Sequence, residues 1–294
     1  MSIFKKFRES AEQQPRLVPF THDWDQFKFR KDVHNIDAYK EGKFPGRYYI
    51  IPPTDDNPEK RAYPSATTIL GQIADLQGEN GWLQAWRDAV GEEEADRVSH
   101  EARTRGTSMH DMAELYIRNE VVKDTHMRGW SLFRKLRPYL DKIDNVHCLE
   151  HALYSDVLQI AGRVDCIGEY DEDYTLEGVL NKDGGAYDVE FNGLITLIDF
   201  KSSRKEKSAK DIGGYKRQIS LYAMAFEEMT DIRIDFGMIL MGIDTMTETK
   251  QPGAKPFEVF LGDYKKTTID EIAKVHEHFG NESFSIEKAY DKFL

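Results

Sequence analysis

A short apolar run that leads into a carboxylate constrains the fold of this chain more than any other feature. Residues Leu194-Ile-Thr-Leu-Ile198 are apolar or β-branched, which is typical of a buried strand, and Asp199-Phe-Lys201 follows at once. A buried carboxylate costs free energy unless it is paired or binds a metal. Side chains two residues apart on a strand share a face, so we expect Lys201 beside Asp199 at the end of this strand.

A second carboxylate follows the same pattern. Asp165 closes the motif Gly162-Arg-Val-Asp165 at the end of another strand-like run, 34 positions before Asp199. We expect both carboxylates and Lys201 to meet at an edge of one sheet, where they can hold a divalent cation and position a water molecule. Asp-x-Lys also occurs often by chance, and the alternative is a set of solvated positions without a function.

Two helical motifs offer partners for these carboxylates. Gly106, His110 and Glu114 are spaced by four and share one helical face, where His110 can act as a neutral imidazole ligand. Gln218 and Tyr222 share a face of a later helix, and an amide and a phenol can orient a lysine, a water or a phosphate. Each motif alone is more typical of structural residues, a satisfied histidine in one case and a core tyrosine in the other.

The apolar periodicity divides the chain into a helical part and a strand-rich part. Helical spacing dominates about 65–140, strands are expected over 47–52, 146–170, 193–201, 233–243 and about 256–261, and further helices over about 209–229 and at the C-terminus. This order predicts an α/β fold with a central mixed β-sheet flanked by helices. No convincing linker divides the sequence in two.

The charge of the chain argues at first against a nucleic-acid partner. The sequence has 52 acidic and 40 basic side chains, a formal net charge of −12, whereas phosphate binding requires Lys and Arg. The distribution is uneven, because 168–196 holds eight acidic side chains against one lysine, and 201–217 holds seven basic side chains against two acidic ones. We therefore expect weak, salt-sensitive binding of a polyanion, confined to one groove.

The sequence also predicts the compartment. No apolar run approaches the roughly 18 residues of a membrane span, and Met1–Ser10 has no signal-peptide core. Two cysteines, Cys148 and Cys166, are too few for a disulfide framework or a four-cysteine metal cluster. We expect a soluble, cytoplasmic protein without a membrane partner.

Four motifs occur in one order along the chain: Gly-x3-His-x3-Glu, Gly-x2-Asp, Asp-x-Lys and Gln-x3-Tyr. This order resembles the RecB-like branch of the PD-(D/E)XK nuclease superfamily, and more narrowly the mitochondrial genome maintenance exonuclease and its phage relatives. Pro64-Ser-Ala-Thr-Thr-Ile-Leu70 and Trp86 are similar to the opening helices of that group. The resemblance covers about residues 60–245.

The resemblance implies a restriction-endonuclease-like core with an N-terminal helical region. The expected nuclease domain is 61–262, with a helical part at 64–141 and a sheet core at 145–245. An N-terminal extension (1–60) and a C-terminal helical region (263–294) flank it, and the resemblance does not explain the first 60 and last 50 residues. Trp82 and Trp86 are expected in the core, with stacking on DNA bases as the alternative.

The resemblance also implies roles for individual residues. The implied ligands of Mg²⁺ or Mn²⁺ are His110, Asp165, Asp199 and the carbonyl of Phe200, with Glu150 supporting a second ion. The implied catalytic residues are Asp165, Asp199, Lys201, Gln218 and Tyr222. Lys201 would orient the attacking water and stabilise its hydroxide character, or the charge that develops on the phosphate, and Gln218 and Tyr222 would brace the lysine and the scissile phosphate. The residues expected to bind DNA are Arg103, Arg105, Ser202, Arg204, Lys205, Lys216 and Arg217.

Two features depart from that group. Many relatives carry four cysteines for an iron–sulfur cluster, and no cluster is expected from the two cysteines here. The acidic stretch 168–196 is longer than the usual hairpin between the two aspartates. We expect it to form a surface hairpin, or a flap near the catalytic centre that limits access of the substrate.

The function implied by the resemblance is a metal-dependent DNA exonuclease that acts on ends of single-stranded DNA in replication, recombination or repair, with unidentified proteins of those pathways as possible partners. A phage-encoded chain would work in the host cytoplasm. Two alternatives stay open: a structure-specific endonuclease with the same metal site, and a non-catalytic DNA-binding subunit.

Overall fold

The computed structural model describes residues 18–294 except 28, 38, 56, 124–125, 171–174, 181–185 and 191–193. Within the acidic stretch 168–196, only the backbone of a two-stranded antiparallel sheet is described between 171 and 193, formed by β6 (Thr175–Leu180) and β7 (Ala186–Glu190). The role expected for the rest of that stretch lies outside the described residues.

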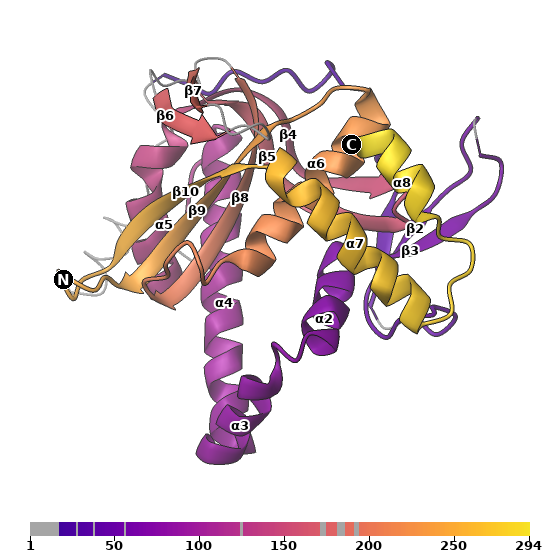
Figure 1. Cartoon of the computed structure of the whole chain (residues 1–294). Coiled ribbons are helices and arrows are strands. Elements are labelled where there is room, and N and C mark those ends of the chain that lie inside the picture. Colours follow the sequence, from indigo (N-terminus) through magenta and orange to yellow (C-terminus); the bar gives the residue numbers. More distant parts are fainter. Residues whose placement is uncertain are drawn as a thin grey trace.

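A five-stranded mixed sheet forms the centre of the molecule (Figure 1). Its strands, in spatial order, are β10 (Gly253–Phe260), β9 (Phe236–Thr245), β8 (Leu194–Lys205), β5 (Ile160–Tyr170) and β4 (Ile143–Ser155). Only β8 and β9 pair in parallel, whereas the other three neighbouring pairs are antiparallel. This arrangement confirms the predicted α/β fold with a central mixed sheet.

Helices cover both faces of the sheet, as the sequence predicts. One face packs against α2 (Ala66–Leu76), α6 (Gly213–Thr230), α7 (Gly262–His278) and α8 (Ile286–Phe293), and the other against α4 (Glu92–Ile117) and α5 (Met127–Leu140). Each side of the sheet has its own apolar cluster, because successive strand residues point to opposite faces. In β8, for example, Leu197 belongs to the first cluster and Ile198 to the second.

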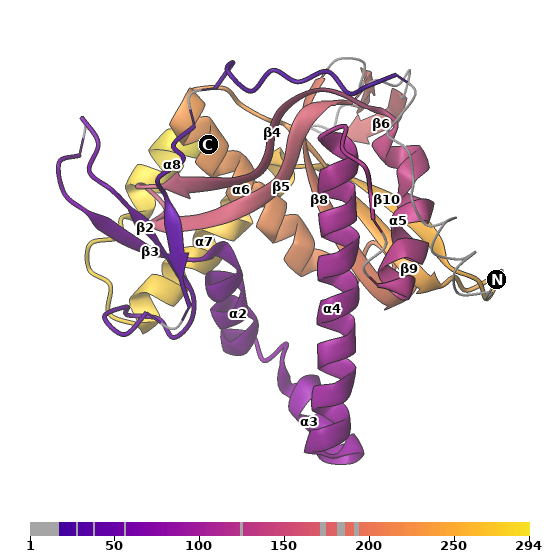
Figure 2. The same cartoon turned by 180° about the vertical axis from the view of Figure 1, so that it is seen from behind.

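From residue 18 onwards, the segment predicted as an N-terminal extension is part of the core. Its strands β1 (His34–Ile36) and β2 (Tyr48–Ile51) form a small sheet with β3 (Arg61–Pro64). Phe20 and Phe27 are buried in the two main clusters, and the amide of Asp23 donates to the carbonyl of Val146 at the start of β4. The segment therefore lies along the edge of the central sheet, where Figure 2 shows it passing over β4.

The helical part reaches well beyond the sheet. The 26-residue α4 extends past the strands, and α3 (Gly81–Val90) packs at its far end, away from the core (Figures 1 and 2). No residue of α3 is buried, and Trp82 is 67 % exposed, so the expectation that this tryptophan packs into the core is wrong. The helix has no second apolar layer to cover it, because the facing half of α4 is strongly charged. Among the described residues, no helix is both long and apolar enough to span a membrane.

Candidate metal centre

The predicted carboxylates lie where two neighbouring strands separate. β5 and β8 pair from Tyr170–Leu194 to Cys166–Ile198, and the next pair in this register is Asp165 and Asp199. Pairing stops there, although both strands continue (Figure 2). The expectation that these aspartates end their strands at a sheet edge is therefore wrong: they lie mid-strand, in the interior of the sheet. They occupy a fork, because β8 stays paired with β9 while β5 stays paired with β4.

Helix α4 places His110 over this fork. The neighbouring Met109, Met112 and Ala113 are buried against the sheet, which fixes the rotation of the helix. One turn before His110, a Cβ atom on Gly106 would lie 3.1 Å from Oγ of Ser202 on β8, so the glycine allows the helix and strand to approach closely. The ring of His110 contacts the edge of Phe200, with 5.9 Å between centroids.

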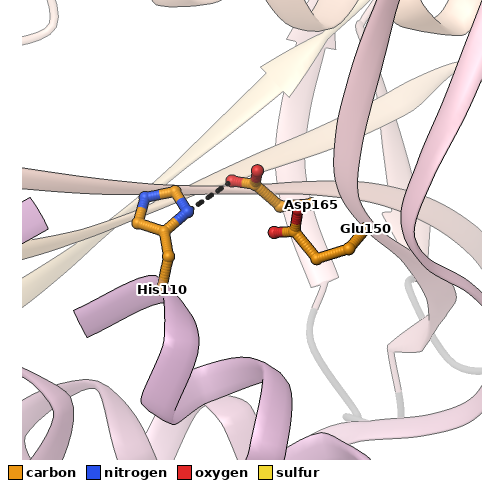
Figure 3. Close-up of side chains that lie close together, drawn as sticks. All are labelled: His110, Glu150 and Asp165. Carbon is orange, nitrogen blue, oxygen red and sulfur yellow. Dashed lines mark ion pairs between the residues drawn. The ribbon is translucent and has the colours of Figure 1, made fainter. Parts of the chain in front are cut away.

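Glu150 of β4 completes the group. The register of β4 and β5 pairs Leu149 with Cys166 and His151 with Val164, so Glu150 stands opposite Asp165, and opposed residues of antiparallel strands share a face. Glu150 has a φ of 49°, a left-handed conformation that is uncommon for a non-glycine residue and that often occurs at functional sites. Its carboxylate, that of Asp165 and the His110 ring lie with their ligand atoms all within 4.8 Å of one another (Figure 3).

The close approach of these groups shifts their pKa values. Burial, reinforced by the negative charge of Asp165, raises the pKa of Glu150 to about 7. Burial also acts to raise the pKa of Asp165, but His110, whose Nδ1 lies 3.6 Å from Oδ2, together with Lys201 and the Phe200 amide, lowers the pKa overall. Burial opposes the charged form of His110, yet the charge and hydrogen bond of Asp165, together with the charge of Asp199, raise the imidazole pKa. The backbone amide of Phe200 donates to Oδ2 of Asp165 at 2.6 Å and fixes that carboxylate.

Asp199 and Lys201 form a buried ion pair beside this group. Nζ of Lys201 donates to Oδ1 of Asp199 at 2.7 Å and lies 2.6 Å from Oδ2, which accepts no hydrogen bond of good geometry. Burial raises the pKa of Asp199 to about 6 although Lys201 opposes the shift, and Asp199 in turn raises the pKa of Lys201 against the effect of burial. Lys201 therefore carries a positive charge inside the site.

Tyr222 of α6 reaches the strands, and Gln218 contacts it along the helical face that the two residues share. The amide nitrogen of Gln218 donates to the Tyr222 hydroxyl at 3.3 Å, and burial raises the pKa of that phenol. A Cβ atom on Gly162 would lie 2.5 Å from the Tyr222 ring, so this glycine makes room for the tyrosine. Gly162 and Tyr222, from two separate sequence motifs, are thus in direct contact.

The basic residues expected to bind DNA fall into two sets. Arg103, Arg204 and Lys205 are exposed, and Ser202 lies against Gly106. The others have partners inside the protein: Arg105 is buried with Asp244 at 2.7 Å, Arg217 pairs with Glu271 at 2.9 Å and with Glu79, and Lys216 donates to the Tyr264 hydroxyl. These partners hold the second set within the fold.

The donor set fits a divalent cation. An imidazole nitrogen and the oxygens of buried carboxylates are ligands of Mg²⁺ and Mn²⁺, and the unsatisfied Oδ2 of Asp199 is a further acceptor next to them. In the described part of the chain, His110, Glu150 and Asp165 form a group of three side chains that could hold a metal ion. The buried Cys148 and Cys166 are not arranged as a cluster.

Two residues near the centre were not identified from the sequence. The ring of Tyr215 lies 5.4 Å from Nζ of Lys201, and Arg163 lies 3.4 Å from the Glu150 carboxylate. Arg163 is inside the motif that contains Asp165, so its position was available as a signal, whereas Tyr215 becomes a neighbour of Lys201 only through the turn that precedes α6.

No model of a known protein family matches the chain, and no curated protein matches it either. The function is therefore inferred from the geometry of the centre.

Proposed function

We propose that this protein is a metal-dependent DNA exonuclease with a restriction-endonuclease-like core, which hydrolyses phosphodiester bonds from the ends of single-stranded DNA. One observation carries the proposal: ligand atoms of His110, Glu150 and Asp165 lie within 4.8 Å of one another, and a charged lysine that is only 17 % exposed lies on the neighbouring strand. Metal ligands beside a fixed cation are what phosphodiester hydrolysis requires, because negative charge develops on the phosphate.

The chain's own residues have separate roles in this proposal. His110, Glu150 and Asp165 would hold Mg²⁺ or Mn²⁺, which when bound supplies Lewis acidity at the phosphate. Lys201 contributes a positive charge that Asp199 keeps in place, and a preorganised charge in a buried site stabilises the transition state strongly. The amide of Phe200 holds the Asp165 carboxylate in a fixed orientation.

The test uses linear and covalently closed circular single-stranded DNA of the same sequence, with Mg²⁺, Mn²⁺ or EDTA. We expect digestion of the linear strand with a metal, no digestion in EDTA and an intact circle. Asp165→Asn should lower the rate by about a hundredfold or more, because it removes a charged ligand. Asp235→Asn, which changes an exposed carboxylate paired with Arg233, is the matched control and should leave the rate unchanged.

Other results contradict the proposal in distinct ways. Cleavage of the circle would identify an endonuclease with the same metal centre. DNA binding without turnover in either metal would identify a non-catalytic subunit. Digestion that survives Asp165→Asn would place the reaction elsewhere in the protein.

A further inference from the structure

A cavity of about 900 Å³ adjoins the metal centre on the side of β4. Glu150 forms part of its wall, and residues 24–25, 27, 29–31 and 33–35 of the N-terminal segment form much of the rest. Two aromatic anchors hold that segment in place: Phe27 packs on His147 and Phe29 packs on His151, both of β4. The volume lies at the upper end of the range of about 300–1,000 Å³ for ligand pockets, which is more than a single phosphate group needs.

The lining of the cavity is cationic. Four Lys and Arg side chains face two carboxylates there: Arg30, Lys31, Arg118 and Arg163 against Asp25 and Glu150. Two of the cations have partners of their own, since Arg30 pairs with Asp32 and Arg118 with Glu114.

The other two cations are exposed in the cavity. Lys31 is exposed, and no described carboxylate forms an ion pair with it. The side chain of Arg163 is 61 % exposed, although it also contacts Glu150 at 3.4 Å. Lys31 and Arg163 thus leave positive charge exposed beside the centre.

An aromatic ring adds a second kind of contact. Trp24 lines the cavity, is 40 % exposed and stacks on His22, with 4.5 Å between centroids and 14° between planes. A ring held flat on one side presents its other face for stacking. Bases of single-stranded DNA stack on such faces regardless of sequence, whereas phosphates bind nearby Lys and Arg.

We propose that this cavity binds the single DNA strand next to the phosphodiester held at the metal centre, with Lys31 and Arg163 at phosphates and Trp24 stacked on a base. The assignment rests on the proposed function, since it takes its substrate from that function. It gives the N-terminal segment a role in substrate binding on the β4 side, separate from the basic stretch 201–217.

The test measures binding of a fluorescently labelled single strand in EDTA, where turnover does not interfere, over a series of salt concentrations. Lys31→Ala should reduce the slope of log affinity against log salt by about 0.7, the value for one lost phosphate contact on a single strand, and lower affinity about fivefold near 0.1 M salt. Lys31→Arg should restore both. Lys288→Ala, which removes an exposed lysine of α8 that does not line the cavity, is the matched control and should change neither.

Trp24 is tested by its own pair of variants. Trp24→Ala should lower affinity at least about fivefold through the lost base stack, with an unchanged salt slope, and Trp24→Phe should recover most of it. Circular dichroism of each variant verifies that it is folded.

The outcomes separate the two proposals. If Lys31→Ala and Trp24→Ala bind DNA as the Lys288→Ala control does, the cavity assignment is overturned even when the wild type digests DNA. If the wild type digests nothing but both variants still bind more weakly than the control, the cavity assignment holds and the proposed activity fails. Tighter binding of an RNA of the same length through the same residues overturns the choice of DNA.

Discussion

Two groups of carboxylates lie along strands β4 and β5, and their surroundings differ. The fork cluster consists of His110, Glu150, Asp165, Asp199 and Lys201, where β5 and β8 separate. The turn cluster consists of Arg61, Tyr63, Ser155, Asp156 and Glu228, around the turn from β4 to β5. Both clusters contain acidic side chains that are largely withdrawn from water.

The carboxylates of the turn cluster accept hydrogen bonds from several donors. Glu228 accepts hydrogen bonds from the Ser155 hydroxyl and from the amides of Asp156, at 2.9 Å, and Val157, at 3.2 Å. Asp156 accepts from the Tyr63 hydroxyl at 2.9 Å and pairs with Arg61. The fork cluster instead brings carboxylates close to one another, and Oδ2 of Asp199 accepts no good hydrogen bond.

The difference shows that burial alone does not identify a functional carboxylate. A buried acid with a complete set of donors stabilises the fold, whereas acids that crowd together without enough donors leave room for an external cation. The contrast predicts opposite responses: changes in the fork cluster should alter activity more than stability, and changes in the turn cluster the reverse.

The largest effect is expected for Lys201→Met. Removing the fixed charge should lower the rate of metal-dependent digestion of single-stranded DNA by about 10²–10³, the usual cost of losing a preorganised group that stabilises the transition state. Lys265→Met is the matched variant, because Lys265 is also buried and paired, with Glu227, but lies away from the fork. It should lose stability and keep its rate per folded molecule. Equal losses of rate in the two variants would refute the distinction.

In the turn cluster, Glu228→Ala should lower the free energy of unfolding by about 2–4 kcal/mol, because it leaves a hydroxyl and two amides without their acceptor. Urea denaturation monitored by tryptophan fluorescence measures the change. The folded variant should digest DNA at the wild-type rate, and a loss of activity with no loss of stability would reverse the roles assigned to the two clusters.

The pH dependence of metal-free stability tests the crowding at the fork. The pKa of Glu150 rises from 4.5 to about 7 on folding, so the folded state binds an extra proton between these values. Its contribution to stability is fully present below about pH 4.5 and is lost as the pH rises through about 7. The raised pKa of Asp199 changes the stability in the same direction. The lowered pKa of Asp165 has the opposite effect: its contribution to stability is lost only as the pH falls below about 3.8.

Glu150→Gln isolates this contribution, because glutamine does not ionise. In EDTA at pH 8 the variant should be more stable than the wild type by up to about 3 kcal/mol, and the difference should shrink towards pH 4.5. Adding Mg²⁺ or Mn²⁺ at pH 8 should stabilise the wild type more than the variant. A stability difference that is constant from pH 4.5 to 8 would mean that Glu150 is not destabilised by its neighbours.

Much of this arrangement follows from the sequence. The alternating and helical periods located the five strands of the central sheet and the helices around it, but not the short strands β1 and β3. The motifs also pointed to Asp165, Asp199 and Lys201, which lie together at the fork. The fork itself could not be predicted, because a strand that loses one of its two pairing partners halfway has the same apolar pattern as one that ends. Glu150, expected at a second ion, lies with His110 and Asp165 in one group through a left-handed backbone that no motif marks.

The internal partners of the basic residues could not be predicted from the sequence either. Arg105 meets Asp244 across 139 positions. Within 201–217, Lys201 pairs with Asp199 and Arg217 with Glu271, so local charge density overstated the cations available there. The segment from residue 18 has aromatic anchors at irregular spacing, such as Phe20 and Phe27, and gives no periodic signal of its place in the core.

The smallest effect is expected for Gly106→Ala, which sharpens the comparison because it changes the fork without touching a ligand. A Cβ atom there would lie 3.1 Å from Ser202 Oγ, so α4 or Ser202 must shift by a few tenths of an ångström. Alanine favours the helix by about 1 kcal/mol over glycine, which offsets the tight contact and keeps the stability change within about 1 kcal/mol. The rate should still fall about three- to tenfold, because His110 lies one turn away on the same face.

Gly71→Ala in α2, where the new methyl group meets open space, is the matched control and should leave the rate unchanged. Adding Ser202→Ala to Gly106→Ala should restore the rate, and failure to do so would show that Ser202 contributes to the site beyond its contact with α4.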